Sequence, residues 1–130
     1  VNAKAAVTAR YAREELKRTA NNELPSKGMD DTDLNQSALI AAQDWANRYS
    51  WKEQLQYVYI TDRDWSILRH KVTGIQTGRR IQGVITMQRS DGLCSYQQAV
   101  FEQAYNGTGY QITVMTGVVP GQNKLDCGKI

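Results

Sequence analysis

The spacing of the apolar residues changes near Leu55, and this change constrains the fold more than any other feature of the chain. Across residues 55–119, apolar and polar side chains alternate in short runs that are separated by turn signals. Such alternation is typical of half-buried strands, whereas the residues before Leu55 repeat with the period of a helix. Because short turns join successive runs, we expect an antiparallel sheet and an α+β class rather than parallel βαβ units.

Two helices are expected before the sheet. Apolar residues recur every three or four positions over about residues 3–20, where most of them are alanine, and again over about residues 33–49. The second repeat places Trp45 and Tyr49 on its apolar face. We therefore expect both aromatic rings to pack in the core, where this helix lies against the sheet.

Turn residues divide the sheet region, residues 54–119, into four to five strands. The strongest turn signals are residues 90–92 and 106–109, which contain Asp-Gly and Asn-Gly. Gly83 lies inside a long expected strand, where a glycine indicates a bulge or a bend and therefore a curved sheet. One face should pack on the helices, and the other should be wet or form a polar cavity. The expected strands cover residues 55–59, 65–73, 79–89, 93–105 and 110–119.

The length of 130 residues corresponds to one domain, 1–130, with a polar tail over residues 120–130. We expect two N-terminal helices packed on a curved antiparallel meander sheet of four to five strands. This arrangement is similar, at the level of the fold, to the cystatin-like and NTF2-like families, in which a curved antiparallel sheet wraps helices. No motif of the chain is specific to either family, so the resemblance implies a fold and carries over no functional residue.

The chain has two cysteines, Cys94 and Cys127, and the sequence leaves two interpretations of them open. The tail around Cys127 is polar and has little means of burying itself, which favours a disulfide to Cys94. Such a bridge stabilises the fold by about 3–4 kcal/mol in the chain-entropy model. It also predicts a secreted or periplasmic protein, because disulfides persist outside the reducing cytosol. The alternative is a pair of free thiols.

The charge balance favours no particular class of partner. The 16 basic and 13 acidic residues give a net charge of +3, a mild excess that argues against a dedicated nucleic-acid interface. No apolar run approaches the ~18 residues that a membrane span needs. The chain begins at Val1 without an initiator methionine, so we expect that residues before it were removed.

Cations gather around one expected turn, residues 74–78, and form the best candidate site. Arginine beside aromatic residues can hold phosphates, carboxylates or sugars, so we expect a small anionic or carbohydrate ligand, or an unknown protein partner. The alternative is a solvated hairpin end with packed aromatic rings. The ligand-binding candidates are four cations and two aromatic residues: Arg69, Lys71, Arg79, Arg80, Trp65 and Tyr96.

The chain has a single histidine, His70, which lies between two cations. Strand alternation places it on the same face as Leu68 and Val72, so we expect a packed, hydrogen-bonded side chain rather than a general base. Nothing in the sequence brings two carboxylates together for proton transfer. One histidine and two cysteines are too few ligands for a structural zinc, so we expect no catalytic residue, no cofactor and no metal.

Three functions remain open. The first is a non-enzymatic, extracytoplasmic binding or protein-interaction domain that uses the polar face of the sheet or the basic hairpin. The second is a small-molecule enzyme with a cone-shaped pocket, in which His70 or an acidic residue carries the proton. The third is nucleic-acid binding through the basic hairpin. The lack of a convergent set of catalytic residues favours the first function.

Overall fold

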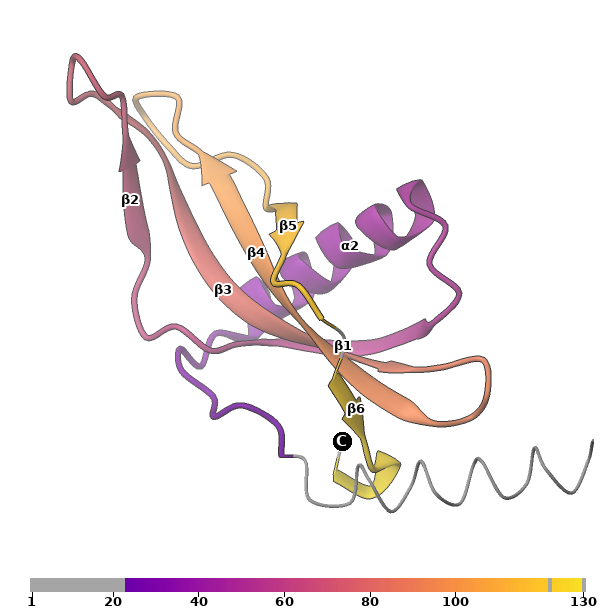
Figure 1. Cartoon of the computed structure of the whole chain (residues 1–130). Coiled ribbons are helices and arrows are strands. Elements are labelled where there is room, and N and C mark those ends of the chain that lie inside the picture. Colours follow the sequence, from indigo (N-terminus) through magenta and orange to yellow (C-terminus); the bar gives the residue numbers. More distant parts are fainter. Residues whose placement is uncertain (1–22, 122, 130) are drawn as a thin grey trace, which may run out of the picture.

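The computed structural model describes residues 23–121 and 123–129 of the chain. Within these residues the protein has one α-helix, six strands and a short 3-10 helix, which confirms the α+β class (Figure 1). The helix expected over residues 3–20 lies outside the described residues. In chain order the elements are α2 (Thr32–Arg48), β1 (Gln54–Ile60), β2 (Ser66–Arg69), β3 (Gln76–Gln88), β4 (Cys94–Ala104), β5 (Val114–Val118), β6 (Asn123–Leu125) and the 3-10 helix Cys127–Lys129.

The sheet is antiparallel and is built around a long hairpin of β3 and β4. These two strands pair from Gly78 opposite Ala104 to Gln88 opposite Cys94. Both β1 and β2 pair with the outer edge of β3, and both β5 and β6 pair with the outer edge of β4. Two short strands therefore share each edge of the hairpin. This sharing gives six strands in the described residues, rather than four to five in a simple meander.

Three strands differ clearly in length from the expected ones. The expected strand over residues 65–73 is reduced to β2, because the chain turns after Arg69. β3 begins at Gln76 rather than at Arg79, because β2 pairs with its first residues. The last expected strand, residues 110–119, is reduced to β5. The chain is irregular over residues 111–113, where Thr113 forms hydrogen bonds through its side chain instead of joining the ladder.

The two strongest turn signals form the expected hairpins. Gly92 closes the turn between β3 and β4 with a positive φ of 83°, and its amide donates to the Arg89 carbonyl over 3.0 Å. Asn106 organises the turn between β4 and β5, where its side-chain oxygen accepts from the amides of Thr108 and Gly109 over 2.9 Å each. These are the turn roles for which glycine and asparagine are suited.

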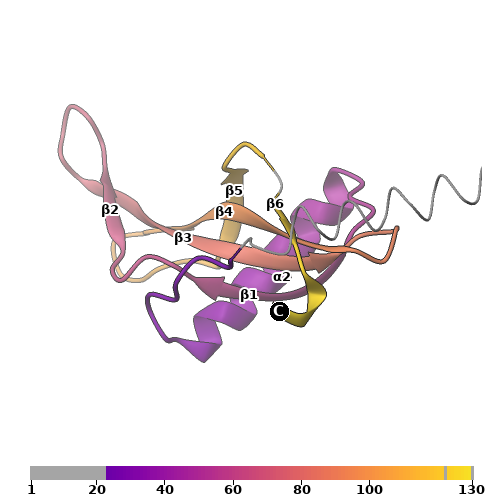
Figure 2. The same cartoon turned by 60° about the horizontal axis from the view of Figure 1, so that its bottom comes forward.

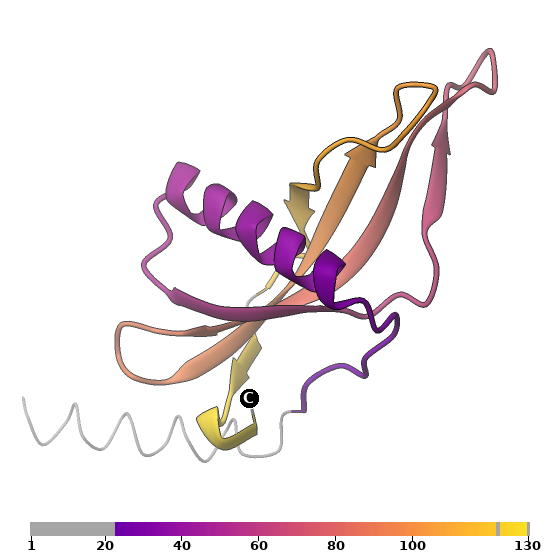
Figure 3. The same cartoon turned by 180° about the vertical axis from the view of Figure 1, so that it is seen from behind.

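Helix α2 lies across one face of the sheet (Figure 3) and supplies one wall of the main core. Asp31 caps its first turn, since its Oδ1 accepts from the Leu34 amide over 3.0 Å. Trp45 is half-buried and packs against the core as expected. Tyr49 is 55% exposed because the helix ends before it, so the expectation that it packs in the core is wrong. The buried helix residues are Leu34, Ala38, Ala41, Ala42 and Ala46.

Gly83 does not form a bulge, because β3 keeps an unbroken register with β4 on both sides of it and with β1 up to the pair of Gly83 with Ile60. A Cβ atom at this position would lie only 2.7 Å from the Tyr59 carbonyl oxygen, so the glycine permits the close approach of β1. The register shift in this part of the sheet lies in β1 instead, between Leu55 and Tyr57.

The sheet face that points away from α2 carries a second buried cluster at its centre, so the expectation of a wet face or a polar cavity is wrong there. The Tyr59 hydroxyl donates to the Pro25 carbonyl over 2.6 Å, which ties the segment before α2 to this face. Burial raises the pKa of Tyr59 to about 12, and charge on Tyr57 and Tyr96 adds to the shift. The buried members of the cluster are Tyr59, Val84, Thr86, Cys94 and Leu125.

The expected disulfide between Cys94 and Cys127 is present, with the two Cα atoms 5.0 Å apart. The tail has a second anchor that the sequence did not reveal, because β6 pairs with β4 and Leu125 is only 1% exposed. A disulfide is consistent with an oxidising compartment outside the cytosol. Within residues 23–121 and 123–129, no helix has the length and hydropathy of a membrane span.

Candidate binding site

Two adjoining hollows lie between α2 and the edge of the sheet that β5 forms. The larger has a volume of about 590 Å³ and the smaller of about 430 Å³, each in the range of a ligand pocket. Ser37, Ile112 and Thr113 line both hollows. We therefore treat them as the two halves of one groove, the α2–β5 groove.

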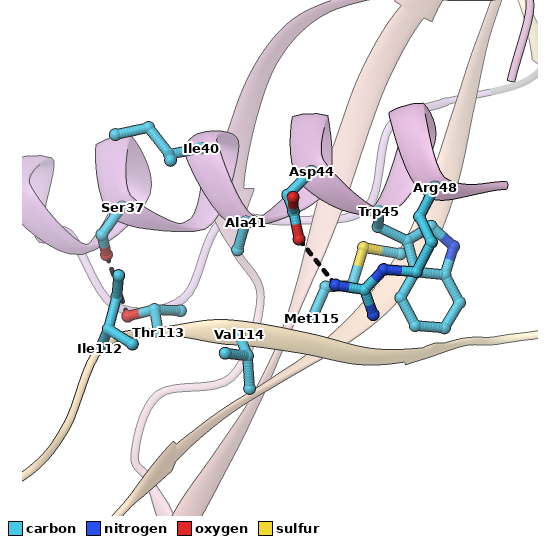
Figure 4. A pocket seen from close by; sticks show the side chains of 10 residues that line it. All are labelled: Ser37, Ile40, Ala41, Asp44, Trp45, Arg48, Ile112, Thr113, Val114 and Met115. Carbon is cyan, nitrogen blue, oxygen red and sulfur yellow. Dashed lines mark hydrogen bonds and ion pairs between the residues drawn. The ribbon is translucent and has the colours of Figure 1, made fainter. Parts of the chain in front are cut away.

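The larger half of the groove is mainly apolar (Figure 4). Ala41 leaves room between helix and strand that a longer side chain at this helical position would fill. Arg48 and Asp44 form an ion pair on the helix side, with Nη2 and Oδ2 2.9 Å apart, and both line this half. The apolar lining residues are Ile40, Ala41, Trp45, Ile112, Val114 and Met115.

The smaller half is polar and contains Arg79 of β3, whose guanidinium lies between two aromatic rings. The guanidinium carbon is 3.9 Å from the ring centroid of Trp65 and 3.7 Å from that of Tyr110. Gln76 supports the second ring, because its Nε2 donates to the Tyr110 hydroxyl over 2.6 Å. Both ring distances lie well within the ~6 Å limit of a cation–π contact, so both rings make such a contact with the guanidinium.

A directed chain of hydrogen bonds joins Arg79 to α2. Arg79 Nε donates to Gln103 Oε1 over 2.9 Å, and Gln103 Nε2 donates to Thr113 Oγ1 over 2.8 Å. The Ser37 hydroxyl donates to the Leu34 carbonyl, so its one hydrogen is used. Thr113 must therefore donate to Ser37 across their 3.1 Å contact. This chain fixes the side-chain orientations at the junction of the two halves.

Gln103 uses the Nε donor of Arg79, and the Nη groups have no hydrogen-bond partner among the described residues, so they are the donors that Arg79 offers to a ligand in the polar half. No carboxylate of the described residues pairs with Arg79. Asp31 and Asp33, at the start of α2, line the same hollow but form no ion pair with Arg79. A planar guanidinium held in this way matches the two oxygens of a carboxylate, and the two acidic residues can accept from N–H donors beside it.

The outer edge of β5 borders the groove. β5 pairs with β4 on one side, and no strand of the described residues pairs with its other side. Three large apolar side chains along this border are exposed: Ile40 by 65%, Ile112 by 77% and Val114 by 46%. An edge strand of this kind presents unpaired backbone groups beside an apolar hollow.

The structure separates the ligand-binding candidates that the sequence had grouped around one turn. Trp65 and Arg79 meet in the polar half of the groove. Arg80 points to the other face of the sheet, where its Nη2 lies 3.4 Å from Glu102 Oε2. The register of β4 places Tyr96 on that face as well.

The other two candidates, Arg69 and Lys71, lie at the exposed end of the β2–β3 hairpin, away from the groove. His70 lies there too, and it lines neither hollow. It is exposed rather than packed, because the strand ends before it and its Nδ1 accepts from the amides of Val72 and Thr73 over 3.2 and 3.3 Å. The expectation that His70 packs beside Leu68 on a strand is therefore wrong.

Several groove residues were not identified from the sequence. Of these residues, Gln103 is the one that the sequence could have indicated. It shares a face of β4 with the buried Phe101, and a polar side chain on a core-facing series needs a hydrogen-bond partner. Nothing in the sequence indicates that Ser37 and Thr113 meet, since they come from a helix and an irregular segment far apart in the chain.

Comparison with family models, with curated proteins and with solved structures finds no match for this chain. Among the described residues, no group of three or more histidine, cysteine, aspartate or glutamate side chains could hold a metal ion.

Proposed function

We propose that this chain is a non-enzymatic binding domain that acts outside the cytosol, and that its α2–β5 groove holds an extended peptide segment. The observation that carries the proposal is the open edge of β5 beside an apolar hollow. In strand addition, backbone hydrogen bonds to such an edge supply affinity, and pockets for alternate side chains supply specificity. The Cys94–Cys127 bridge supports a secreted or periplasmic location.

An extended peptide fits this groove better than a compact molecule does. The lining residues of the two halves together extend along α2 from Asp31 to Arg48, so the hollow is elongated. Side chains at every second position of an added strand would point into the apolar hollow, whose exposed lining includes Ile40 and Ile112. A partner segment with apolar residues at every second position matches this arrangement.

The polar half suggests the direction of the peptide. β5 begins at Val114, next to Thr113 and the hollow that Arg79 lines. A strand that runs antiparallel to β5 ends at this point, so its terminal carboxylate would lie beside the Nη edge of Arg79. Its last N–H groups would then lie within the hollow that Asp31 and Asp33 also line.

The first test uses a fluorescein-labelled hexapeptide of alternating threonine and valine with a free C-terminal carboxylate, titrated with the full chain by fluorescence anisotropy. Two N-methylated versions each block the backbone donors along one edge of the peptide. Because only one edge would face β5, one version should bind at least about tenfold more weakly while the other keeps its affinity. Equal affinities for the two versions would contradict strand addition.

A matched pair of variants locates the binding surface. Ile112→Asp introduces a charge at the β5 border and should weaken the hexapeptide by at least about tenfold. Ile75→Asp places the same charge on an equally open isoleucine of the β2–β3 hairpin, since the two side chains are 77% and 67% exposed, and it should leave binding unchanged. Sedimentation of the chain alone provides a further check, because a dimer that excludes the peptide would mean that the edge of β5 is occupied by a second copy.

A further inference from the structure

The turn that joins β2 to β3 is the most outlying part of the described chain. In Figures 1 and 2 this hairpin extends away from α2 and from the rest of the sheet. We call residues 69–75 the hairpin tip. It contributes to neither half of the groove.

The hairpin tip combines apolar side chains with positive charge. Val72 is 88% exposed and Ile75 is 67% exposed, and they lie at the end of the turn. Arg69 and Lys71 precede them in the same turn. No acidic residue occurs between Trp65 and Ser90 in the sequence, and the neighbouring turn, residues 105–111, has none either.

Most of the amides of the hairpin tip are hydrogen-bonded within the tip itself. The His70 amide donates to the Ile75 carbonyl over 2.8 Å, and the Gly74 amide donates to the His70 carbonyl over 2.9 Å. The side chain of His70 accepts from two further amides, and Thr73 Oγ1 accepts from the Ile75 amide over 3.3 Å. The Gly74 carbonyl accepts from Arg69 Nη1 over 3.2 Å. Each of these internal hydrogen bonds lowers the cost of moving the loop into a low-dielectric environment.

We propose that the hairpin tip docks the protein peripherally on an anionic lipid surface, with Val72 and Ile75 in the headgroup–acyl boundary and Arg69 and Lys71 at the headgroups. The charge of the tip complements anionic lipid. Two exposed aliphatic side chains at the apex favour a lipid interface, which can bury them, over an acidic polymer that is bound by charge alone. A turn that pairs most of its amides internally can enter that interface with few donors unpaired.

The experiment measures flotation of the full chain with vesicles of phosphatidylcholine alone and of phosphatidylcholine with about a third phosphatidylglycerol. We expect binding to the anionic vesicles only, and weaker binding as salt is raised, because the exposed charges are screened. Absence of binding to the anionic vesicles at low salt would overturn the proposal.

Two sets of variants separate the apolar and charged contributions. Lys71→Gln should lower the partition coefficient about fivefold, and Val72→Ser at least about fivefold. The matched controls are Lys52→Gln, an exposed lysine elsewhere, and Val118→Ser, an exposed valine that lines neither hollow, and both should bind as the wild type does. Binding that Val72→Ser leaves intact, and that soluble heparin abolishes, would instead assign the tip to acidic polymers and refute docking on lipid.

A site-specific label tests insertion directly. The two cysteines of the chain are joined to one another, so Val72→Cys supplies a single thiol for an environment-sensitive fluorophore. The emission should shift to shorter wavelength on anionic vesicles. The same label at Thr116→Cys, an exposed position of β5, should not shift. Equal shifts at both positions would contradict docking through the tip.

Discussion

Gln103 fixes the position of Arg79 across the central strand pair, because Arg79 Nε donates to Gln103 Oε1 over 2.9 Å. The two residues are also direct partners in the β3–β4 register. The other end of the Gln103 amide donates to Thr113, so one side chain links the cation of the groove to the segment that leads into β5. The polar half of the groove is therefore built on a fully directed chain of donors and acceptors.

Gln103→Leu should destabilise the fold by about 1–2 kcal/mol, because it removes two hydrogen bonds of partly buried groups while keeping a similar volume. Gln88→Leu is the matched control, since Gln88 is an exposed residue of the neighbouring strand β3, and its substitution should change the free energy of unfolding much less. Urea unfolding of both variants measures the difference. Equal losses would show that the chain of hydrogen bonds contributes nothing to stability.

Arg79→Lys should reduce the preference of the groove for a peptide with a free C-terminal carboxylate over the same peptide with an amidated end. A lysine ammonium cannot stack between two rings and present two parallel donors as a guanidinium does. Arg80→Lys is the matched control, because Arg80 is adjacent in β3 but lies on the other face beside Glu102. For the wild type and each variant, the measurement is the dissociation constant of the amidated peptide divided by that of the peptide with a free carboxylate. A ratio of one in the wild type would show that Arg79 binds no carboxylate.

Removal of the disulfide should lower the free energy of unfolding by about 3–4 kcal/mol. The double variant Cys94→Ala with Cys127→Ala tests this by denaturant titration, with the reduced wild type as a control that should match it. Part of β6 should remain protected in the variant, because Leu125 is buried in its own right. A loss below about 1 kcal/mol would mean that strand pairing alone holds the tail.

Tyr59 should make the stability depend on pH in the alkaline range. Its pKa is about 12 in the folded chain, against an ordinary value of 10.0, mainly because of burial. A phenol with a raised pKa in the folded state stabilises the fold fully below the unfolded pKa of 10.0, and this contribution is lost as the pH rises through about 12.

Across this interval, the free energy of unfolding of the wild type should fall by on the order of 1–2 kcal/mol more than that of Tyr59→Phe. Tyr49→Phe provides the control, because Tyr49 is 55% exposed and its replacement should leave the wild-type profile unchanged. Denaturant titrations at several pH values measure the profiles. Parallel profiles for the wild type and Tyr59→Phe would contradict the assignment.

The sequence predicted the parts of the fold that depend on neighbouring residues. Alternation located the strands, and the turns at Gly92 and Asn106 followed from the conformations that these residues tolerate. The disulfide was predicted because only one partner existed for each cysteine. The splitting of both sheet edges was not predicted, since it depends on how β1, β2, β5 and β6 share a hairpin that is longer than any of them.

The groove was harder to predict because it depends on contacts between distant residues. Trp65 and Arg79 were identified as candidates, but Tyr110, which completes the stack, was assigned to a regular strand. Arg80 was grouped with Arg79 by proximity in sequence, although adjacent strand residues point to opposite faces. The pairing of Ser37 with Thr113 depends on where α2 crosses the sheet, which no local pattern specifies.

Hydrogen exchange at β5 in the presence of the threonine–valine hexapeptide tests strand addition most directly. Amides on the open edge of Val114–Val118 should exchange fast in the free chain and slow down when the peptide is bound, at alternate residues only. Amides of β1, which lies at the opposite edge of the sheet, should not change. Protection confined to β1 or to the hairpin tip, or an unchanged β5 at a peptide concentration that saturates the anisotropy, would contradict the proposed binding site.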